Sequence, residues 1–129
     1  MNIIPGFYYS KNDEWVEVKG NKATVGITDY AQNSLSDIVF VEISVSEGDP
    51  VEASDLLGTV ESVKAASDVY TPVAGIVAAT NEAVIDNPEL INTDPFGKAW
   101  LIQVENENGI DTSGLMNAEE YKTYCEGRG

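Results

Sequence analysis

The chain of 129 residues contains no histidine and only one cysteine, Cys125. Without histidine it has no Ser-His-Asp or Cys-His pair, no HExxH zinc site and no ordinary general base near neutral pH. A single cysteine excludes an intrachain disulfide and fits a reducing compartment, so we expect a cytoplasmic protein of a prokaryote. Cys125 is interpreted as a packed thiol, because no base accompanies it in the sequence.

Positive charge is also scarce, since seven Lys and Arg residues stand against 22 Asp and Glu and leave a net charge of −15. No Lys/Arg cluster exists to neutralise phosphates, so nucleic acid and anionic membrane surfaces are poor partners. The longest uncharged apolar stretch, residues 73–79, is far shorter than a bilayer-spanning helix. We therefore expect a protein that binds neither nucleic acid nor membrane.

The sequence also lacks the motifs of nucleotide and metal sites. Neither a GxxxxGK[ST] phosphate loop nor a GxGxxG fingerprint occurs, and the 11 glycines are scattered singly. The carboxylates form no EF-hand pattern, so no metal site is expected. Together these absences disfavour an enzyme that works alone.

A series of short β-like runs dominates what the sequence does contain. Alternating side chains on either side of Gly20-Asn21 predict a β-hairpin over residues 14–19 and 22–28. Further strands are predicted over residues 38–45, 56–63, 69–73, 75–79 and 99–105. Turn residues 47–50 follow the first of these strands, and Pro50 is expected to end that strand. Evenly spaced short strands favour a sandwich or barrel, and the length suits one domain, residues 1–129.

Two helices are predicted from capping patterns. Asp29 with Gln32 resembles a capping box before a helix over residues 30–35. Asn117 with Glu120 forms a second one, before a helix over residues 121–126 that Gly127 should stop. We expect the aromatic side chains of this terminal helix to pack on the sheet. Between the strands, turns or a short helical loop are predicted over residues 81–92.

Lys64 stands apart from the other cations. It is the only one from residue 23 to residue 97, a stretch that holds 13 acids, and it lies at a predicted hairpin tip beside two alanines. The residues alone leave three interpretations open. Lys64 is a surface lysine paired with Glu61 or Asp68, a Schiff-base lysine, or an acylated lysine that carries a swinging cofactor.

Several segments resemble the H protein of the glycine cleavage system. They are residues 26–32 (GITDYAQ), 37–42 (DIVFVE), 88–92 (PELIN), 94–97 (DPFG) and above all 61–68 (ESVKAASD). The resemblance runs from about residue 7 to residue 126. It implies a mainly β protein, a flattened β-barrel sandwich like that of lipoyl and biotinyl domains, with a short linking helix and a C-terminal helix.

The resemblance implies that Lys64 carries lipoic acid in amide linkage. Biotin carriers usually flank their lysine with methionines, and Val63 and Ala65 stand there instead. Glu61 lies three residues before the lysine and Gly75 eleven after it, where the family presents recognition residues to the attaching enzyme. The family cleft that shelters the loaded arm falls on four positions, Asn12, Glu14, Ser34 and Asp68.

Within that cleft, Glu14 and Asp68 match the carboxylates that hold an ammonium group. Two histidines of the family pattern are absent. Asp13 replaces the first residue of the usual His-Glu-Trp motif, and Ser34 stands where the linking helix commonly has a histidine. A position that usually bears a hydroxyl is Asn12. These departures bear on the tuning of arm release and on its pH dependence.

The function implied by the resemblance is that of a non-catalytic carrier. Its arm would take the aminomethyl group of glycine from glycine decarboxylase (P protein) to an aminomethyltransferase (T protein). Dihydrolipoyl dehydrogenase (L protein) would then receive the electrons, and a lipoate ligase or lipoyl transferase would attach the cofactor. Two alternatives remain: an H-protein-like lipoyl carrier for sulfur oxidation or lipoate relay, and an acidic binding domain without a cofactor.

Overall fold

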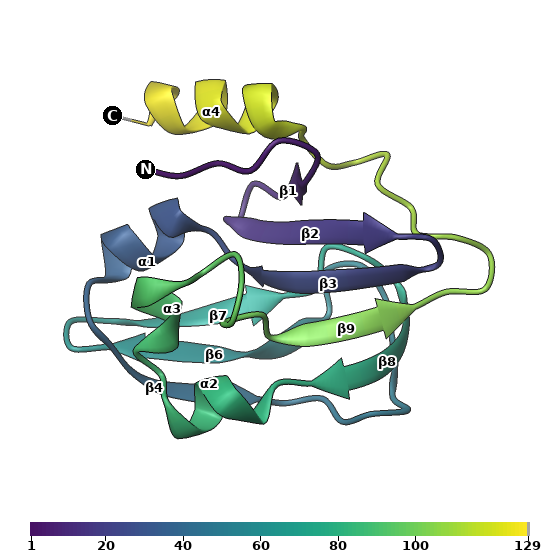
Figure 1. The fold of residues 1–129 in the computed structure, drawn as a ribbon, viewed down its shortest axis with the longest axis horizontal. Coiled ribbons are helices and arrows are strands. Elements are labelled where there is room, and N and C mark those ends of the chain that lie inside the picture. Colours follow the sequence, from purple (N-terminus) through teal and green to yellow (C-terminus); the bar gives the residue numbers. More distant parts are fainter. Residues whose placement is uncertain (129) are drawn as a thin grey trace.

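Two antiparallel sheets form the body of the computed structural model, which describes residues 1–128 (Figure 1). The first sheet has the strand order β1-β2-β3-β9-β8-β5 and the second has the order β4-β6-β7. The elements are β1 Tyr8–Tyr9, β2 Glu14–Lys19, β3 Lys22–Ile27, α1 Asp29–Leu35, β4 Ile38–Ile43, β5 Pro50–Val51, β6 Leu56–Ser62, β7 Ala66–Tyr70, β8 Gly75–Thr80, α2 Glu82–Asp86, α3 Leu90–Thr93, β9 Ile102–Glu105 and α4 Ala118–Gly127. Gly129, the last residue of the predicted domain, lies outside the described residues.

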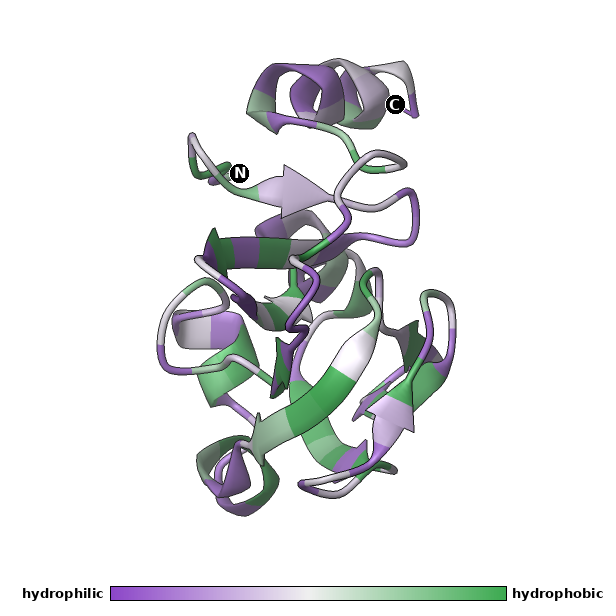
Figure 2. Cartoon of the chain, turned by 90° about the vertical axis from the view of Figure 1, so that its right-hand side faces the viewer, coloured by the Kyte–Doolittle hydropathy of each residue, from purple (hydrophilic) through white to green (hydrophobic). Residues whose placement is uncertain are grey.

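One apolar cluster joins the inner faces of the two sheets. Val25 and Val104 enter it from the first sheet, and the cross-strand partners Val41 and Val60 enter it from the second. β-Branched side chains suit such pleated, buried faces. Figure 2 shows the hydrophobic segments concentrated on the strands, whereas α4 is largely hydrophilic. The predicted mainly β sandwich, with a linking helix and a C-terminal helix, is confirmed.

The predicted strands are all present, but several of them begin or end at other residues than predicted. The hairpin of β2 and β3 forms around Gly20-Asn21, where Gly20 has a φ of 62°. Pro50 does not end the preceding strand; β4 already stops at Ile43, and Pro50 begins the edge strand β5, where a missing N–H is tolerated. The strand predicted over residues 99–105 begins only at Ile102.

The strand predicted over residues 69–73 is the largest error. The observed strand β7 starts three residues earlier, at Ala66, directly after the turn that contains Lys64. Its first residues are small or polar and carry no β-branched signal. Pairing with β6, in which Ala66 lies opposite Glu61 and Ser67 opposite Val60, makes them a strand. Tertiary pairing here overrides local propensity.

One of the two predicted helix caps is wrong and the other is correct. Thr28, rather than Asp29, caps α1, because Thr28 Oγ1 accepts a hydrogen bond from Ala31 N at 3.2 Å. Gln32 Nε2 donates instead to Asp29 Oδ1 at 2.7 Å, so the predicted capping box is absent. The capping box of α4 is confirmed, although Gly127 belongs to the helix and does not follow it. The segment over residues 81–92 supplies two short helices, α2 and most of α3.

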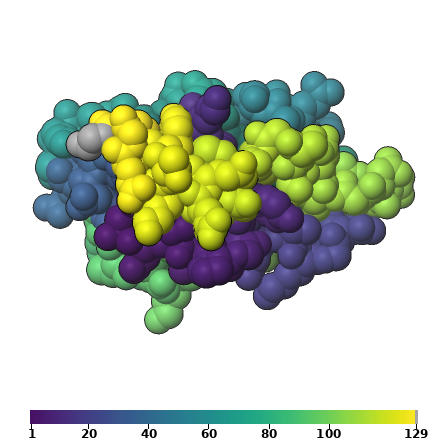
Figure 3. All heavy atoms as spheres, turned by 90° about the horizontal axis from the view of Figure 1, so that it is seen from above, coloured from purple at the N-terminus to yellow at the C-terminus, as the bar shows by residue number. Residues whose placement is uncertain are grey.

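The C-terminal helix is fixed to the N-terminal part of the chain, as Figure 3 shows from above. The ring of Tyr121 stacks on that of Tyr9, with centroids 4.5 Å apart, which confirms the expected aromatic packing. Cys125 is buried, and burial raises the pKa of its thiol, as expected for a packed cysteine. These contacts place α4 over the segment that leads into β2.

Arg128 adds an ion pair between this helix and the turn before β2. Its two guanidinium nitrogens donate to the carboxylate of Asp13 at 2.7 and 2.8 Å, and the guanidinium lies 4.1 Å from the ring centroid of Tyr30. Tyr121 Oη also donates to Asp13, at 2.9 Å. Asp13 has a φ of 67°, a conformation that needs such support in a residue other than glycine.

The ion pair between Arg128 and Asp13 should contribute measurably to the stability of the fold. Replacing Arg128 by alanine should lower the free energy of unfolding by about 1–3 kcal/mol, because it leaves a partly buried carboxylate with fewer donors. Urea denaturation measures this change. Lys22→Ala is the control, since its ion pair with Glu105 is half-exposed and 3.4 Å long, and it should cost less than about 1 kcal/mol. Equal losses in both variants would contradict the assigned role.

Candidate functional site

Lys64 lies in the tight turn that joins β6 to β7, at one end of the sandwich (Figure 1). Ser62 shapes this turn. Its backbone N donates to Ala65 O at 2.7 Å, and its Oγ accepts from the backbone N of Lys64 at 3.2 Å and of Ala65 at 3.0 Å. The hydrogen bonds hold the backbone of the turn and leave the Lys64 side chain exposed. The predicted hairpin tip is confirmed.

The amine of Lys64 is available for chemistry. Among residues 1–128, Lys64 forms no ion pair, so the interpretation that Glu61 or Asp68 neutralises it is wrong. Asp68 Oδ1 accepts instead from Thr59 Oγ1 at 3.3 Å. An exposed amine on a flexible stem, next to Ala65 and Ala66, fits a group attached through an amide.

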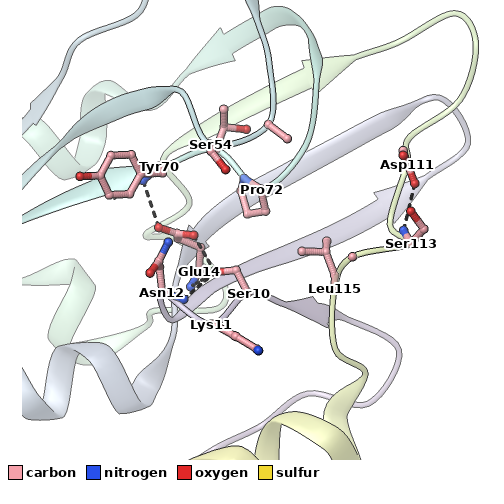
Figure 4. Close-up of a pocket in the computed structure, with 13 residues that line it drawn as sticks. Ser10, Lys11, Asn12, Glu14, Ser54, Tyr70, Pro72, Asp111, Ser113 and Leu115 are labelled. Carbon is pink, nitrogen blue, oxygen red and sulfur yellow. Dashed lines mark hydrogen bonds between the residues drawn. The ribbon is translucent and has the colours of Figure 1, made fainter.

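A pocket of about 440 Å³ opens beside β7, as Figure 4 shows. Its central acid is Glu14, which is only 1% exposed. Ser10 Oγ donates to Glu14 Oε1 at 2.6 Å, and the backbone N of Tyr70 donates to Glu14 Oε2 at 3.0 Å. Because Glu14 begins β2 and Tyr70 ends β7, the carboxylate joins the two sheets at this pocket.

Burial raises the pKa of the Glu14 carboxyl, and the hydrogen bonds from Ser10 and Tyr70 offset only part of that effect. The charged form is therefore poorly solvated. The charged form of Glu14 would attract a cation such as an ammonium group into the pocket, and this preference is opposed by Lys11, which also lines the pocket. Protonation of Glu14 as the pH falls would remove this preference.

Two more of the predicted cleft residues lie next to this pocket. Asn12 and Asp68 line a second hollow of about 450 Å³, and three residues line both hollows: Lys11, Asn12 and Tyr70. Glu14 thus lines only the first hollow and Asp68 only the second, and Asn12 is shared by both. Ser34 is an exposed residue of α1 and belongs to the lining of neither hollow.

Gly75 has a structural requirement of its own. Its φ is 156°, and a Cβ placed there would lie 2.3 Å from the carbonyl oxygen of Glu105. The residue begins β8 at the end of the sandwich opposite the turn that bears Lys64 (Figure 1). Packing against β9 therefore requires glycine here.

Sequence reasoning missed Ser10 and Tyr70 as parts of the pocket. Tyr70 acts through its backbone N–H, which no side-chain pattern reveals. Ser10 lies four residues before Glu14 in a turn without periodicity, and a polar residue close to a buried acid was the only available signal. The loop of residues 111–115, which closes the far side of the pocket, carried no signal either.

Within residues 1–128, no helix combines the length and the apolar character needed to cross a bilayer.

Three comparisons with known proteins point to the same family, and each covers almost the whole chain. The family model described as "Glycine cleavage H-protein" matches residues 7–128. The glycine cleavage system H protein of Thermoanaerobacter pseudethanolicus is 52% identical over 126 residues, which cover 98% of each chain. That of Bacteroides fragilis is 48% identical over 122 residues, covering 95% of this chain and 96% of the other. A crystal structure of a glycine cleavage system H protein from Mycobacterium marinum superposes with a TM-score of 0.86 at 34% identity, covering 95% of this chain and 99% of that one. The chain belongs to the glycine cleavage H-protein family.

Proposed function

We propose that this protein is a lipoyl carrier of the glycine cleavage system and that Lys64 is its attachment residue. The observation that supports this proposal most is the exposed amine of Lys64, at the tip of a turn held by hydrogen bonds of Ser62, in a chain of this family. When attached, the lipoyl group would supply a disulfide, which is reduced when it takes up the aminomethyl group of glycine and is restored when the resulting dithiol is oxidised. The chain itself performs no catalytic step.

The residues of the chain supply position, charge and shelter. The hydrogen-bonded turn sets the origin of the Lys64 stem, while the stem stays free to move. Glu14 and Asp68 hold a primary ammonium group through charge-assisted hydrogen bonds, with Asn12 between them as a neutral polar neighbour. For Ser34 as a fourth member of the cleft, the support is the resemblance alone.

Glu61 and Gly75 are proposed as recognition residues for the lipoate ligase or lipoyl transferase. Glu61 is exposed on the outer face of β6, within reach of an enzyme that takes in Lys64. Gly75 acts through the backbone path of β8 and not by contact, since it lies at the far end of the sandwich. Any side chain at this position would disturb the strand first.

The working partners are proposed from the same assignment. They are glycine decarboxylase (P protein), the aminomethyltransferase (T protein) and dihydrolipoyl dehydrogenase (L protein). A net charge of −15 suits encounter with basic docking sites on these enzymes and disfavours nucleic acid. We propose one carrier domain working in a bacterial cytoplasm, in keeping with bacterial relatives such as that of Thermoanaerobacter pseudethanolicus.

One observation favours a second candidate, a lipoyl carrier for sulfur oxidation or lipoate relay. Asp13 and Ser34 replace the two histidines of the usual pattern. Asp13 lines the second hollow, but its carboxylate already accepts hydrogen bonds from Arg128 and Tyr121. A carrier fully modified at Lys64 that is inert toward glycine decarboxylase, yet passes its lipoyl group to another apoprotein, would support this candidate.

The Lys64 assignment predicts the outcome of a charge-preserving substitution. Lys64→Arg should fold like the wild type but gain no lipoyl mass, because a guanidinium stays protonated and is not acylated. Intact-mass spectrometry after incubation with lipoate and a competent ligase measures this. Lys98→Arg is the control and should be modified fully. Lipoylation of the Lys64 variant would refute the assignment.

The recognition role of Glu61 predicts a kinetic effect without a stability effect. Glu61→Ala should slow lipoylation about tenfold, as expected for the loss of a contact at an enzyme interface. Its thermal midpoint should hardly change, because an exposed carboxylate contributes little to folding. Glu47→Ala removes an equally exposed acid from a distant turn and should be modified at the normal rate. Identical rates for both variants would exclude the role.

If the acidic cleft holds the ammonium group, it should slow the loss of ammonia from the loaded carrier. The double variant Glu14→Gln with Asp68→Asn should still be lipoylated, yet release ammonia several-fold faster when the transferase is withheld, because neither carboxylate holds the ammonium group. Ammonia is measured after charging with glycine and decarboxylase. Glu47→Gln with Asp49→Asn changes the same charge elsewhere and should release ammonia at the wild-type rate. An unchanged rate in the cleft variant would count against the cleft.

A further inference from the structure

Three exposed apolar side chains, Val39, Phe40 and Val63, lie beside the Lys64 turn and form what we call the tip patch. Val63 is 67% exposed, Val39 56% and Phe40 46%. Val63 N donates to Asp37 O at 3.1 Å, which ties the turn to the segment before β4. The other exposed large apolar residues lie on other elements or at the far end of β6: Met1, Leu56, Ile76 and Ile85.

The strand register places Phe40 on the outer face of the second sheet. Phe40 lies opposite Glu61, and Glu61 lies opposite Ala66, so these three side chains share one face. The inward-facing row beside them contains the buried partners Val41 and Val60. A bulge between Ile38 and Phe40 leaves Val39 exposed as well. The register and the bulge therefore turn Phe40 and Val39 to solvent, and Val63 is exposed within the turn itself.

Acids surround the patch on the same face. The next outward row contains Glu42, Thr59 and Asp68, and Glu61 lies within the row of Phe40. Lys64 is the only cation from residue 23 to residue 97. A partner that covered this face would need an apolar pocket for Phe40 and a basic rim.

We propose that the tip patch is the docking surface for the enzyme that acylates Lys64, with Phe40 as its apolar anchor; this rests on the proposed function. Amide formation requires Lys64 Nζ to lose a proton and displace the leaving group of an activated lipoyl carboxyl. The amine must therefore enter the enzyme, which brings the residues around the turn into contact with it. Before modification no arm exists, so the protein surface alone identifies this lysine among six.

The enzymes that act after modification bind a protein that already carries the arm. They receive the end of an attached arm, which extends away from the turn, and so need less contact with the patch. For this reason the proposal commits to the acylating enzyme and not to a later partner. It also accounts for the cost of leaving three large apolar side chains exposed on one small surface.

The test compares Phe40→Ser with Ile76→Ser, which removes an equally exposed apolar side chain (48%) from β8 of the other sheet. With a lipoate ligase, Phe40→Ser should lower kcat/KM for lipoylation at least about tenfold, as for truncation of an anchor residue. Val63→Ser should act in the same direction, whereas Ile76→Ser should change it less than about twofold. Phe40→Tyr keeps the ring and should restore most of the rate.

Two further measurements decide the identity of the partner. Raising the salt concentration should slow lipoylation of the wild type, and less so for Glu42→Gln with Glu61→Gln, because fewer charges are screened. Phe40→Ser that has been fully lipoylated by prolonged reaction should support glycine–CO₂ exchange at the wild-type rate.

Three outcomes would overturn the proposal: an unchanged lipoylation rate in Phe40→Ser, an equal loss in Ile76→Ser, or a parallel loss of exchange by fully lipoylated Phe40→Ser. The last would assign the patch to a later partner. Failure of the wild type to accept lipoate at all would instead defeat the proposed function. Thermal midpoints of all variants identify any loss that comes from misfolding.

Discussion

The carboxylate of Glu14 bonds to both halves of this molecule. One oxygen accepts from Ser10 in the turn before β2, and the other accepts from the backbone of Tyr70 at the end of β7. A buried charge is tolerated only when it is hydrogen-bonded, so the two segments must stay in place together. The same strand, β7, leads back to the turn that bears Lys64. These two hydrogen bonds of Glu14 thus help to fix the position of the pocket relative to Lys64.

A second constraint reinforces the first from outside. Arg128 and Tyr121 hold Asp13, the residue next to Glu14, in a left-handed conformation. The C-terminal helix therefore supports the cleft although it lines neither hollow. By contrast, the Lys64 side chain is exposed and forms no ion pair with any residue from 1 to 128. A hydrogen-bonded cleft next to an exposed lysine is the arrangement that the proposed carrier function requires, because a carrier must hold its cargo and later release it.

The sequence predicted the class of the fold and the place of Lys64, because turn residues between strands and an isolated cation are local signals. It failed at β7, where Ala66 and Ser67 become a strand only through pairing with β6. It also failed at Ser10 and Tyr70, whose contribution arises from a contact between distant segments. The exposure of Phe40 was hidden for a similar reason: an apolar run from 38 to 41 suggests burial throughout, and only the bulge and the register turn Phe40 outward.

The central claim, that this chain is a lipoyl carrier for glycine cleavage, is tested most directly by glycine–CO₂ exchange. Wild-type protein is prepared with and without lipoate, checked by intact mass, and mixed with glycine decarboxylase, glycine and labelled bicarbonate. If the protein is such a carrier, label should enter the carboxyl group of glycine at a rate proportional to the concentration of lipoylated protein, and unmodified protein should give only the background. Background exchange with fully lipoylated protein would contradict the account.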